Sequence, residues 1–439
     1  MFRLGDFYEA FYEDAETIAK AIGLTLTARQ GTPMCGVPFH TVESAIDKLI
    51  AKGFKIAIAE QTEDPKQTKG IVKREVVRIV TPGTIVNSEL LSDKKNNFFV
   101  SVNLFGNHFG LAVLDLTTSE FRVLEIERTQ NVIDELCRIK PTELLVSKNF
   151  EFLKELSFHF PFISNERASL DLKMAEDVLT GHFDVRSLDA FGLRAKKAAV
   201  LAAGSLLLYL KEELSLNLDH IQTFSNDFQS EFMALDRSTM KNLEINESLV
   251  DILDETCTPM GGRLVRFFVQ HPLLNPKEIQ KRQEKVSFFI HERELSKSLH
   301  RALSQIRDLE RLIMKITASY AGPRNLLEMG KSLSCLPEIK KLFPTINLFD
   351  AEPLAEYILN ALNDSPPLRT TEGEIFMKPI PKDFSFCSSK RRRVIESIQN
   401  VFSERFCIEK IDSGKQFFYF GKTRERLSLI HISEPTRPY

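Results

Sequence analysis

The sequence predicts a multidomain protein in which two mixed α/β domains precede a mostly helical one. Its 439 residues are too many for a single hydrophobic core. Strand-like and helix-like patterns alternate over residues 1–90 and again over residues 96–228. From residue 229 onward, apolar residues keep mainly the helical spacing. We therefore expect domains at 1–90, 96–228 and 229–385, followed by a short segment at 386–426 and a tail at 427–439.

In the first domain, Phe2–Leu4 has the character of a strand, and Gly5-Asp6 breaks it. An amphipathic helix follows and ends at Gly23, where a left-handed C-cap is expected. Gly53 ends a second helix in the same way. The remaining elements are expected as helices at Glu13–Ala21 and Val42–Lys52, and strands at Leu24–Ala28, Lys55–Ala59 and Val76–Val80.

The second domain begins with three strands in a meander, because turn residues separate three short apolar runs. The later part of the chain carries helix-start signals at Thr258-Pro259 and Asn275-Pro276. The apolar residues from Leu303 to Ile316 predict one helix that Gly322-Pro323 ends. In the second domain we expect strands at Phe98–Leu104, Gly110–Leu116, Glu120–Ile126 and Glu143–Val146, and a helix at Thr129–Ile139.

Composition narrows the class of protein. A net charge of −2 excludes a globally basic nucleic-acid coat, so DNA binding would depend on local patches. The 6 cysteines form no Cys-x-x-Cys pair, and no histidines stand at metal spacing, which favours reduced thiols in the cytoplasm and no metal ion. The run Ala198–Leu210 is too short to cross a bilayer and no signal peptide is recognisable, so we expect no contact with a membrane.

Three motifs stand in the first domain: Gly5-Asp6-Phe7-Tyr8-Glu9, the stretch Met34–His40 (MCGVPFH) and the stretch Val77–Thr84 (VRIVTPGT). Taken alone, Phe7 and Phe11 are interpreted as core residues four apart on one helix face. In this order and spacing, however, the motifs resemble the mismatch-recognition domain of the bacterial MutS family.

The resemblance implies a fold for each domain. It implies a small mixed α/β mismatch-recognition domain at 1–90, a ribonuclease H-like connector at 96–228, core and lever helices at 229–385 that are cut short, and the start of a clamp at 386–426. It also implies recognition of mispaired or looped bases in double-stranded DNA, with Phe7 inserted as a wedge that bends the duplex and Glu9 hydrogen-bonded to the same base. The family dimerises and recruits a MutL-type protein.

The densest basic run of the first domain admits two interpretations. It is either a solvated loop or a set of phosphate contacts that position a duplex without reading its sequence. Its members are Lys66, Lys69, Lys73, Arg74 and Arg78.

No ATP site is expected, although the full-length family is an ATPase that uses ATP and magnesium. Gly421-Lys422-Thr423 imitates the end of a phosphate-binding loop, but Gln416 stands where its first glycine is required. The chain is therefore expected to have no catalytic residue and no cofactor, and to lack the family's ATPase and dimerisation domain.

Two other functions compete with mismatch recognition. One is a ribonuclease H-like nuclease that uses Asp115 as a metal ligand, and the other is a DNA-bending module without mismatch preference. The tail at 427–439 resembles a translated sequencing adapter, so we expect the natural sequence to stop near Arg426, where the reading frame is cut inside the clamp. Met1 lies almost on the first motif, so it is expected to be an internal methionine of a longer protein.

Overall fold

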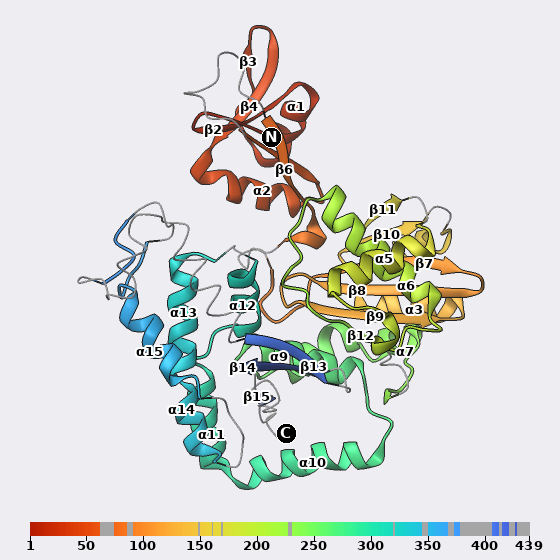
Figure 1. The fold of residues 1–439 in the computed structure, drawn as a ribbon, viewed down its shortest axis with the longest axis vertical. Helices are drawn as coiled ribbons and strands as arrows, with labels where there is room; N and C mark the ends of the chain where they lie inside the picture. The colour runs from red at the N-terminus through yellow and green to blue at the C-terminus, as the bar shows by residue number, and fades with distance from the viewer. Residues whose placement is uncertain are drawn as a thin grey trace.

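The computed structural model contains two α/β domains and a helical domain, which confirms the fold class expected from the sequence (Figure 1). Figure 1 shows the first domain standing apart at one end of the molecule, with the second and helical domains side by side below it. The structure describes residues 1–61, 74–85, 91–147, 150–159, 161–167, 170–226, 231–318, 321–344, 350–367, 373–377, 406–411, 415–420 and 426–427.

The first domain is a six-stranded sheet in the order β3-β4-β2-β1-β5-β6. Helices α1 and α2 pack on one of its faces, where Tyr8 and Val37 join the apolar side of α2 in a common core. The bounds are β1 Phe2–Leu4, β2 Phe7–Phe11, α1 Tyr12–Ile22, β3 Thr27–Arg29, β4 Thr32–Pro38, α2 Val42–Ile50, β5 Ile56–Gln61 and β6 Arg74–Val80.

The segment after Gly5-Asp6 differs from the sequence-based expectation. Phe7 and Phe11 lie on a strand, β2, and not on a helix face. Gly5 adopts a φ of 62°, which lets β1 turn back into β2 with Leu4 opposite Phe7. The neighbouring strand also differs, because β3 covers only the end of the expected Leu24–Ala28. Pairing with β1 and β4 overrides the helical spacing of the two phenylalanines.

The second domain confirms the expected meander, since β7, β8 and β9 are consecutive antiparallel strands. Strands β10 and β11 extend the sheet in parallel on the side of β7, giving the strand order of a ribonuclease H-like fold. Helices α5 and α6 cover one face of this sheet and α3 covers the other. The bounds are β7 Phe98–Phe105, β8 His108–Asp115, β9 Glu120–Ile126, α3 Thr129–Ile139, β10 Glu143–Ser147, α4 Phe152–Leu156, β11 Ile163–Arg167, α5 Leu172–Phe183, α6 Lys197–Leu208 and β12 Ser225–Asn226.

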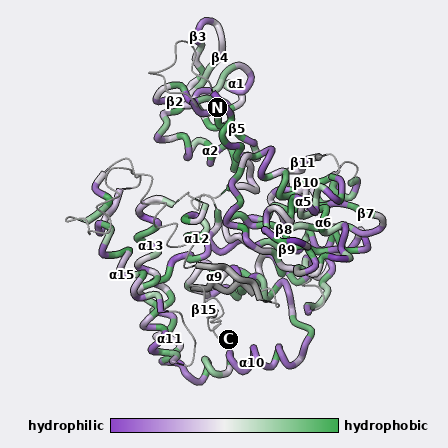
Figure 2. The backbone as a smooth tube through the Cα atoms, viewed as in Figure 1, coloured by the Kyte–Doolittle hydropathy of each residue, from purple (hydrophilic) through white to green (hydrophobic). Residues whose placement is uncertain are grey.

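Helix α6 covers most of the apolar run Ala198–Leu210 and is buried, and it is hydrophobic along its length in Figure 2. In contrast, α10 in the helical domain is largely hydrophilic. No helix among the described residues combines the length and the apolar character that crossing a membrane requires.

The helical domain starts its helices at the expected caps. The side chain of Thr258 accepts a hydrogen bond from the backbone N–H of Gly261, and Asn275 accepts one from Lys277. The bounds are α7 Arg237–Asn242, α8 Val250–Leu253, α9 Pro259–Gln270, α10 Pro276–His291, α11 Arg293–Leu303, α12 Leu309–Thr317, α13 Pro323–Ser334, α14 Leu336–Leu342 and α15 Glu352–Ala361, with an antiparallel sheet of β13 Phe406–Ile411, β14 Lys415–Phe420 and β15 Arg426–Leu427.

One helical expectation is wrong. The continuous helix expected from Leu303 to Ile316 is split, because α11 ends at Leu303 and α12 begins at Leu309. Asp308 caps α12 by accepting a hydrogen bond from the N–H of Arg311. The apolar residues on both sides of the break still enter one core, so the spacing identified the buried residues but not the break.

The Thr-Pro-Gly-Thr turn (residues 81–84) fastens the first domain to the second. Glu143 of β10 is fully buried, and its carboxylate accepts hydrogen bonds from the Thr81 hydroxyl at 2.5 Å and the Gly83 N–H at 3.0 Å. The side chain of Asn97 donates to the Pro82 carbonyl at 2.8 Å. Burial raises the pKa of Glu143, although its hydrogen bonds oppose that shift. The motif is therefore a docking element whose donors surround one carboxylate.

Two buried arginines of the helical domain hold the chain that leads from the first domain into the second. Arg263 of α9 forms a bidentate ion pair with Asp308, at 2.7 and 2.8 Å, and also donates to the carbonyl of Asp93 at 2.9 Å. Arg311 of α12 donates to the carbonyl of Lys95 at 2.6 Å. Both contacts satisfy charged groups away from water, so they fix this connection against the helices.

A substitution at Gly83 tests the docking turn. A Cβ atom there would lie 2.8 Å from the Cβ of Glu143, which cannot move without shifting β10. We expect Gly83→Ala to lower the free energy of unfolding by about 1–3 kcal/mol in urea titrations followed by circular dichroism. Gly181→Ala is the control, since no atom lies within 4 Å of a Cβ there and α5 should tolerate it. Equal stability of the two variants would contradict the tight packing at the turn.

A buried histidine makes the second domain sensitive to acid. His220 is only 6% exposed, and burial lowers its pKa to about 4. His182 lies nearby, and burial followed by the charge of Lys211 lowers its pKa as well. A histidine that stays neutral when folded but accepts a proton when unfolded favours unfolding as the pH falls.

We expect the free energy of unfolding of the protein to decrease between about pH 6.5, where an unfolded histidine titrates, and about pH 4. In His220→Gln this decrease should be smaller by up to roughly 3 kcal/mol at the acid end. At pH 8 both states are neutral at this position, so the difference between the proteins there reports packing alone. A difference that stays constant from pH 8 to pH 4 would rule out the titration of His220.

Candidate nucleic-acid interface

Strand β2 presents two different faces because successive side chains of a strand alternate. Tyr8 and Ala10 are buried beneath the helices, whereas Phe7 on the opposite face is 46% exposed. Leu4 on β1 and Pro38 on β4 lie directly across from Phe7. The ring of Phe7 therefore stands on the open face of the sheet, with a rigid strand on either side.

Glu9 is the next residue of β2 on this open face. Its partners in register are Phe2 on β1 and Gly36 on β4. The Oε2 atom of Glu9 is buried and accepts no hydrogen bond from any described residue. A buried acceptor without a donor is costly, so this oxygen is a candidate for binding a donor on a ligand.

Further aromatic side chains lie on this face. Phe2 is exposed and its ring centroid lies 6.3 Å from that of Phe11, on the same side of the sheet as Phe7. Exposed aromatic rings gathered around one carboxylate are typical of a surface that binds a partner.

The opposite face holds β2 in place. The hydroxyl of Tyr8 donates a hydrogen bond to Glu60 on β5. Burial and this carboxylate raise the pKa of Tyr8. The guanidinium of Arg3 lies 5.8 Å from the centroid of the Tyr8 ring and 5.2 Å from that of Phe39. Because these contacts involve the residue between Phe7 and Glu9, they fix the direction of both side chains.

The basic residues expected to contact phosphate have different outcomes. Lys66, Lys69 and Lys73 lie outside the described residues. Arg74 of β6 donates from Nε to the carbonyl of Arg3 at 3.1 Å. Arg78 points to the helical side of the sheet, where it pairs with Glu43 of α2 at 2.6 Å. The structure thus brings Phe7 and Glu9 together, but it places Arg78 on the face opposite to them.

Sequence reasoning missed Phe2, Gly36 and Pro38 as members of this surface. The stretch Met34–His40 was recognised as a motif, but no strand was assigned to it. In the structure its first part is β4, which pairs with the whole of β2. The aromatic residues Phe7, Tyr8 and Phe11 were the available signal, because aromatic residues are enriched in strands.

The carboxylate of Asp115 is occupied by hydrogen bonds from neighbouring residues. It is fully buried at the end of β8, and its donors are Thr117, Asn96 and Asn97. No cluster of histidine, cysteine or acidic residues suited to a metal ion occurs in the described part of the chain. The hydrogen bonds of Asp115 close the turn between β8 and β9, so its role is structural.

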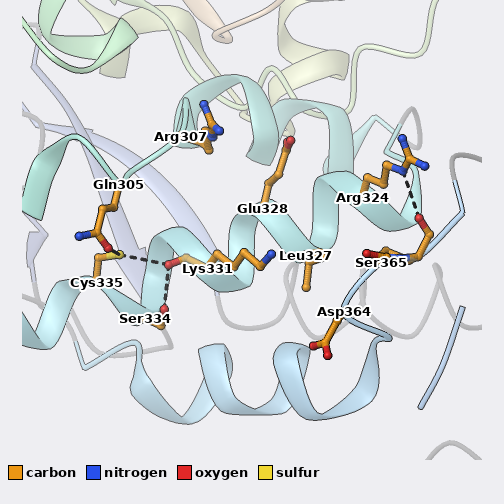
Figure 3. A pocket seen from close by; sticks show the side chains of 11 residues that line it. Gln305, Arg307, Arg324, Leu327, Glu328, Lys331, Ser334, Cys335, Asp364 and Ser365 are labelled. Atoms are coloured by element: carbon orange, nitrogen blue, oxygen red, sulfur yellow. Dashed lines mark hydrogen bonds between the residues drawn. The ribbon is translucent and has the colours of Figure 1, made fainter. Parts of the chain in front are cut away.

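A pocket of about 600 Å³ lies in the helical domain, beside α13 and the chain after α15 (Figure 3). Arg324 donates from Nε to the carbonyl of Pro366 at its rim. The pocket mixes cations such as Lys331 with the carboxylates of Glu328 and Asp364, and Figure 3 shows that these groups do not converge on one point. It therefore favours no single class of ligand.

Comparison with known proteins agrees with this geometry. Family models described as MutS domain I, MutS domain II and MutS domain III match residues 1–89, 97–222 and 238–418. The chain is 45% identical to the DNA mismatch repair protein MutS of Protochlamydia amoebophila, over 95% of this chain and 52% of that protein. The MutS of Chlamydia pneumoniae is 38% identical over 87% of this chain and 50% of its own length.

The MutS of Alkaliphilus oremlandii is 38% identical over 98% of this chain and 53% of its own length. The chain thus spans about half the length of the curated relatives that it matches. The matches to the three domains follow one another in the order of the sheet of β2, the meander of β7 to β9 and the helical domain. The chain belongs to the MutS family of DNA mismatch repair proteins.

Proposed function

We propose that this chain recognises mispaired or looped bases in double-stranded DNA by inserting the ring of Phe7 as a wedge. The observation that carries the proposal is the exposed Phe7 beside the carboxylate of Glu9 on one open sheet face. The matched relatives are named as DNA mismatch repair proteins, which agrees with this activity.

The physical basis of recognition is the ease with which a mismatch deforms. A mispaired step stacks poorly, so it costs less to unstack and kink than a paired step. An apolar wedge inserted from the minor groove exploits that difference by bending the duplex. The ring of Phe7 is flat and apolar, and stacking of a base on an aromatic ring contributes roughly 1–3 kcal/mol.

Glu9 supplies discrimination. Its carboxylate is close enough to Phe7 along β2 to hydrogen-bond the base that the ring contacts. A carboxylate near phosphates is unfavourable on intact DNA, where no displaced base compensates for the repulsion. The unpartnered Oε2 atom supports this role, because a base N–H would satisfy it.

The remaining roles are extensions of this proposal. Lys66, Lys69, Lys73 and Arg74 are proposed to contact phosphates, a sequence-independent contribution that weakens with salt. The ion pair of Arg78 with Glu43 makes Arg78 the weakest member of that set.

We expect this chain to bind no ATP or metal ion and to catalyse no reaction, because its sequence holds no phosphate-binding loop. The whole protein is proposed to act in the cytoplasm, to dimerise, and to recruit a MutL-type partner, with ATP and magnesium bound beyond this region.

The first test removes the wedge. We expect Phe7→Ala to weaken binding to a G·T duplex by about tenfold or more, and to bring it close to the affinity for matched DNA. Fluorescence anisotropy at a fixed salt concentration measures both affinities. Residual binding should fall with added salt in the same way for both duplexes, because phosphate contacts remain.

The control for that test is stability. Phe7 is 46% exposed, so Phe7→Ala should change the free energy of unfolding by less than about 1 kcal/mol. Tyr8→Ala removes the adjacent buried ring and should cost about 3 kcal/mol. A folded Phe7→Ala protein that still prefers the G·T duplex would overturn the wedge assignment. Equal affinity of the unmodified protein for matched and G·T duplexes would instead favour a DNA-bending module without mismatch preference.

The second test concerns the charge of Glu9. Glu9→Gln keeps hydrogen-bonding groups but removes repulsion from phosphates, so affinity for matched DNA should rise by several-fold. The preference for the mismatch should then narrow, with little change in stability. The same anisotropy titrations at low salt, where phosphate repulsion is least screened, provide the measurement. An unchanged affinity for matched DNA would exclude a repulsive role for the carboxylate.

A further inference from the structure

We infer that Gly36 is a positioning residue, which keeps open a slot beside Glu9 and so determines where the carboxylate is held. This inference rests on the proposed function, because it concerns how the same surface discriminates between duplexes. The slot is a property of the protein without DNA, so its existence can be tested independently of DNA binding.

The geometry places Gly36 directly against the side chain of Glu9. The two residues are partners in the register of β2 and β4. A Cβ atom on Gly36 would lie 3.1 Å from the Cγ of Glu9 and 3.1 Å from the carbonyl oxygen of Tyr8. A larger residue at position 36 would therefore crowd the side chain of Glu9, which would have to shift to make room.

Backbone conformation does not account for this glycine. Gly36 is not among the described residues with positive φ, unlike Gly5 at 62°, so its φ is accessible to other residues. Close approach of an element other than the paired strand β2 does not account for it either. At Gly110 a Cβ would lie 1.8 Å from the carbonyl oxygen of Ala198 on α6, whereas the nearest atoms at Gly36 all belong to Tyr8 and Glu9 on the paired strand.

The slot explains the environment of the carboxylate. Glu9 is only partly exposed, and its Oε2 atom is buried without a hydrogen-bond donor among the described residues. Phe7 on the same face is more exposed. The Phe7 ring extends farther from the sheet than the Glu9 carboxylate. The ring would therefore contact DNA before the carboxylate does. Only a base displaced toward the strand would then reach the Glu9 acceptor. The position of the carboxylate would therefore favour duplexes that contain a displaced base over matched duplexes.

The first experiment needs no DNA. In Gly36→Ala the side chain of Glu9 should be pushed out of the slot, and its carboxyl should become several-fold more reactive toward a water-soluble carbodiimide. Peptide mass spectrometry measures the modification at Glu9, with Gly181→Ala as the control variant. Unchanged reactivity of Glu9 in folded Gly36→Ala would overturn the inference.

A double-mutant cycle covers the case in which Gly36→Ala unfolds the protein. If the clash is with the side chain of Glu9, Gly36→Ala should lower the thermal midpoint of unfolding in the unmodified protein but not in Glu9→Ala. If the clash is with the carbonyl of Tyr8, the loss should be the same in both backgrounds, and the slot would be refuted.

The DNA experiment links the slot to discrimination. Gly36→Ala should reduce the ratio of the matched to the G·T dissociation constant by about three- to tenfold, which is the effect of one lost hydrogen bond. Adding Gly36→Ala to Glu9→Ala should not reduce that ratio further. A full ratio despite a displaced Glu9 would refute the positioning role. Absence of any preference in the unmodified protein would instead refute the proposed function, and carbodiimide reactivity would still decide whether the slot exists.

Discussion

The two-faced strand β2 is the constraint on which the rest of this surface depends. Tyr8 and Ala10 are buried beneath α1 and α2. Because side chains alternate along a strand, Phe7 and Glu9 must lie on the open face. A slip of one residue in register would place the ring of Phe7 in the core and that of Tyr8 in solvent. The apolar core of the first domain therefore fixes the chemistry of its exposed side.

Buried charge extends that constraint to the other domains. Glu143 holds the turn that follows β6, and Arg263 and Arg311 hold the chain just beyond it. Removing one partner of such a group leaves the other unsatisfied, so these contacts tolerate few alternative arrangements. The first domain, which stands apart in Figure 1, is thus tied to both domains below it through one short stretch of chain.

Local signals predicted much of the fold, and pairing decided the remainder. The meander of β7 to β9 and the helix at Thr129–Ile139 follow from patterns complete within the element. Strand β2 is stable only through β1 and β4, and the break before α12 depends on Asp308, which Arg263 holds from another helix. At the candidate site, the resemblance indicated Phe7 and Glu9 as the residues to consider, but no motif indicated that Gly36 lies directly against the side chain of Glu9.

In the proposed mechanism, stacking on Phe7 and selection of a mismatch have different energetic origins. Stacking of a base on the Phe7 ring would contribute roughly 1–3 kcal/mol but would tolerate every base, so the ring alone could not select a mismatch. Selection arises from the lower cost of deforming a mispaired step, and a wedge senses that cost only if it does not yield itself. Hydrogen bonding of Tyr8 to Glu60 and stacking of Arg3 make the strand beneath the ring resistant to displacement. In the proposed mechanism, the rigidity of the sheet therefore contributes to recognition, because it would direct the deformation into the DNA.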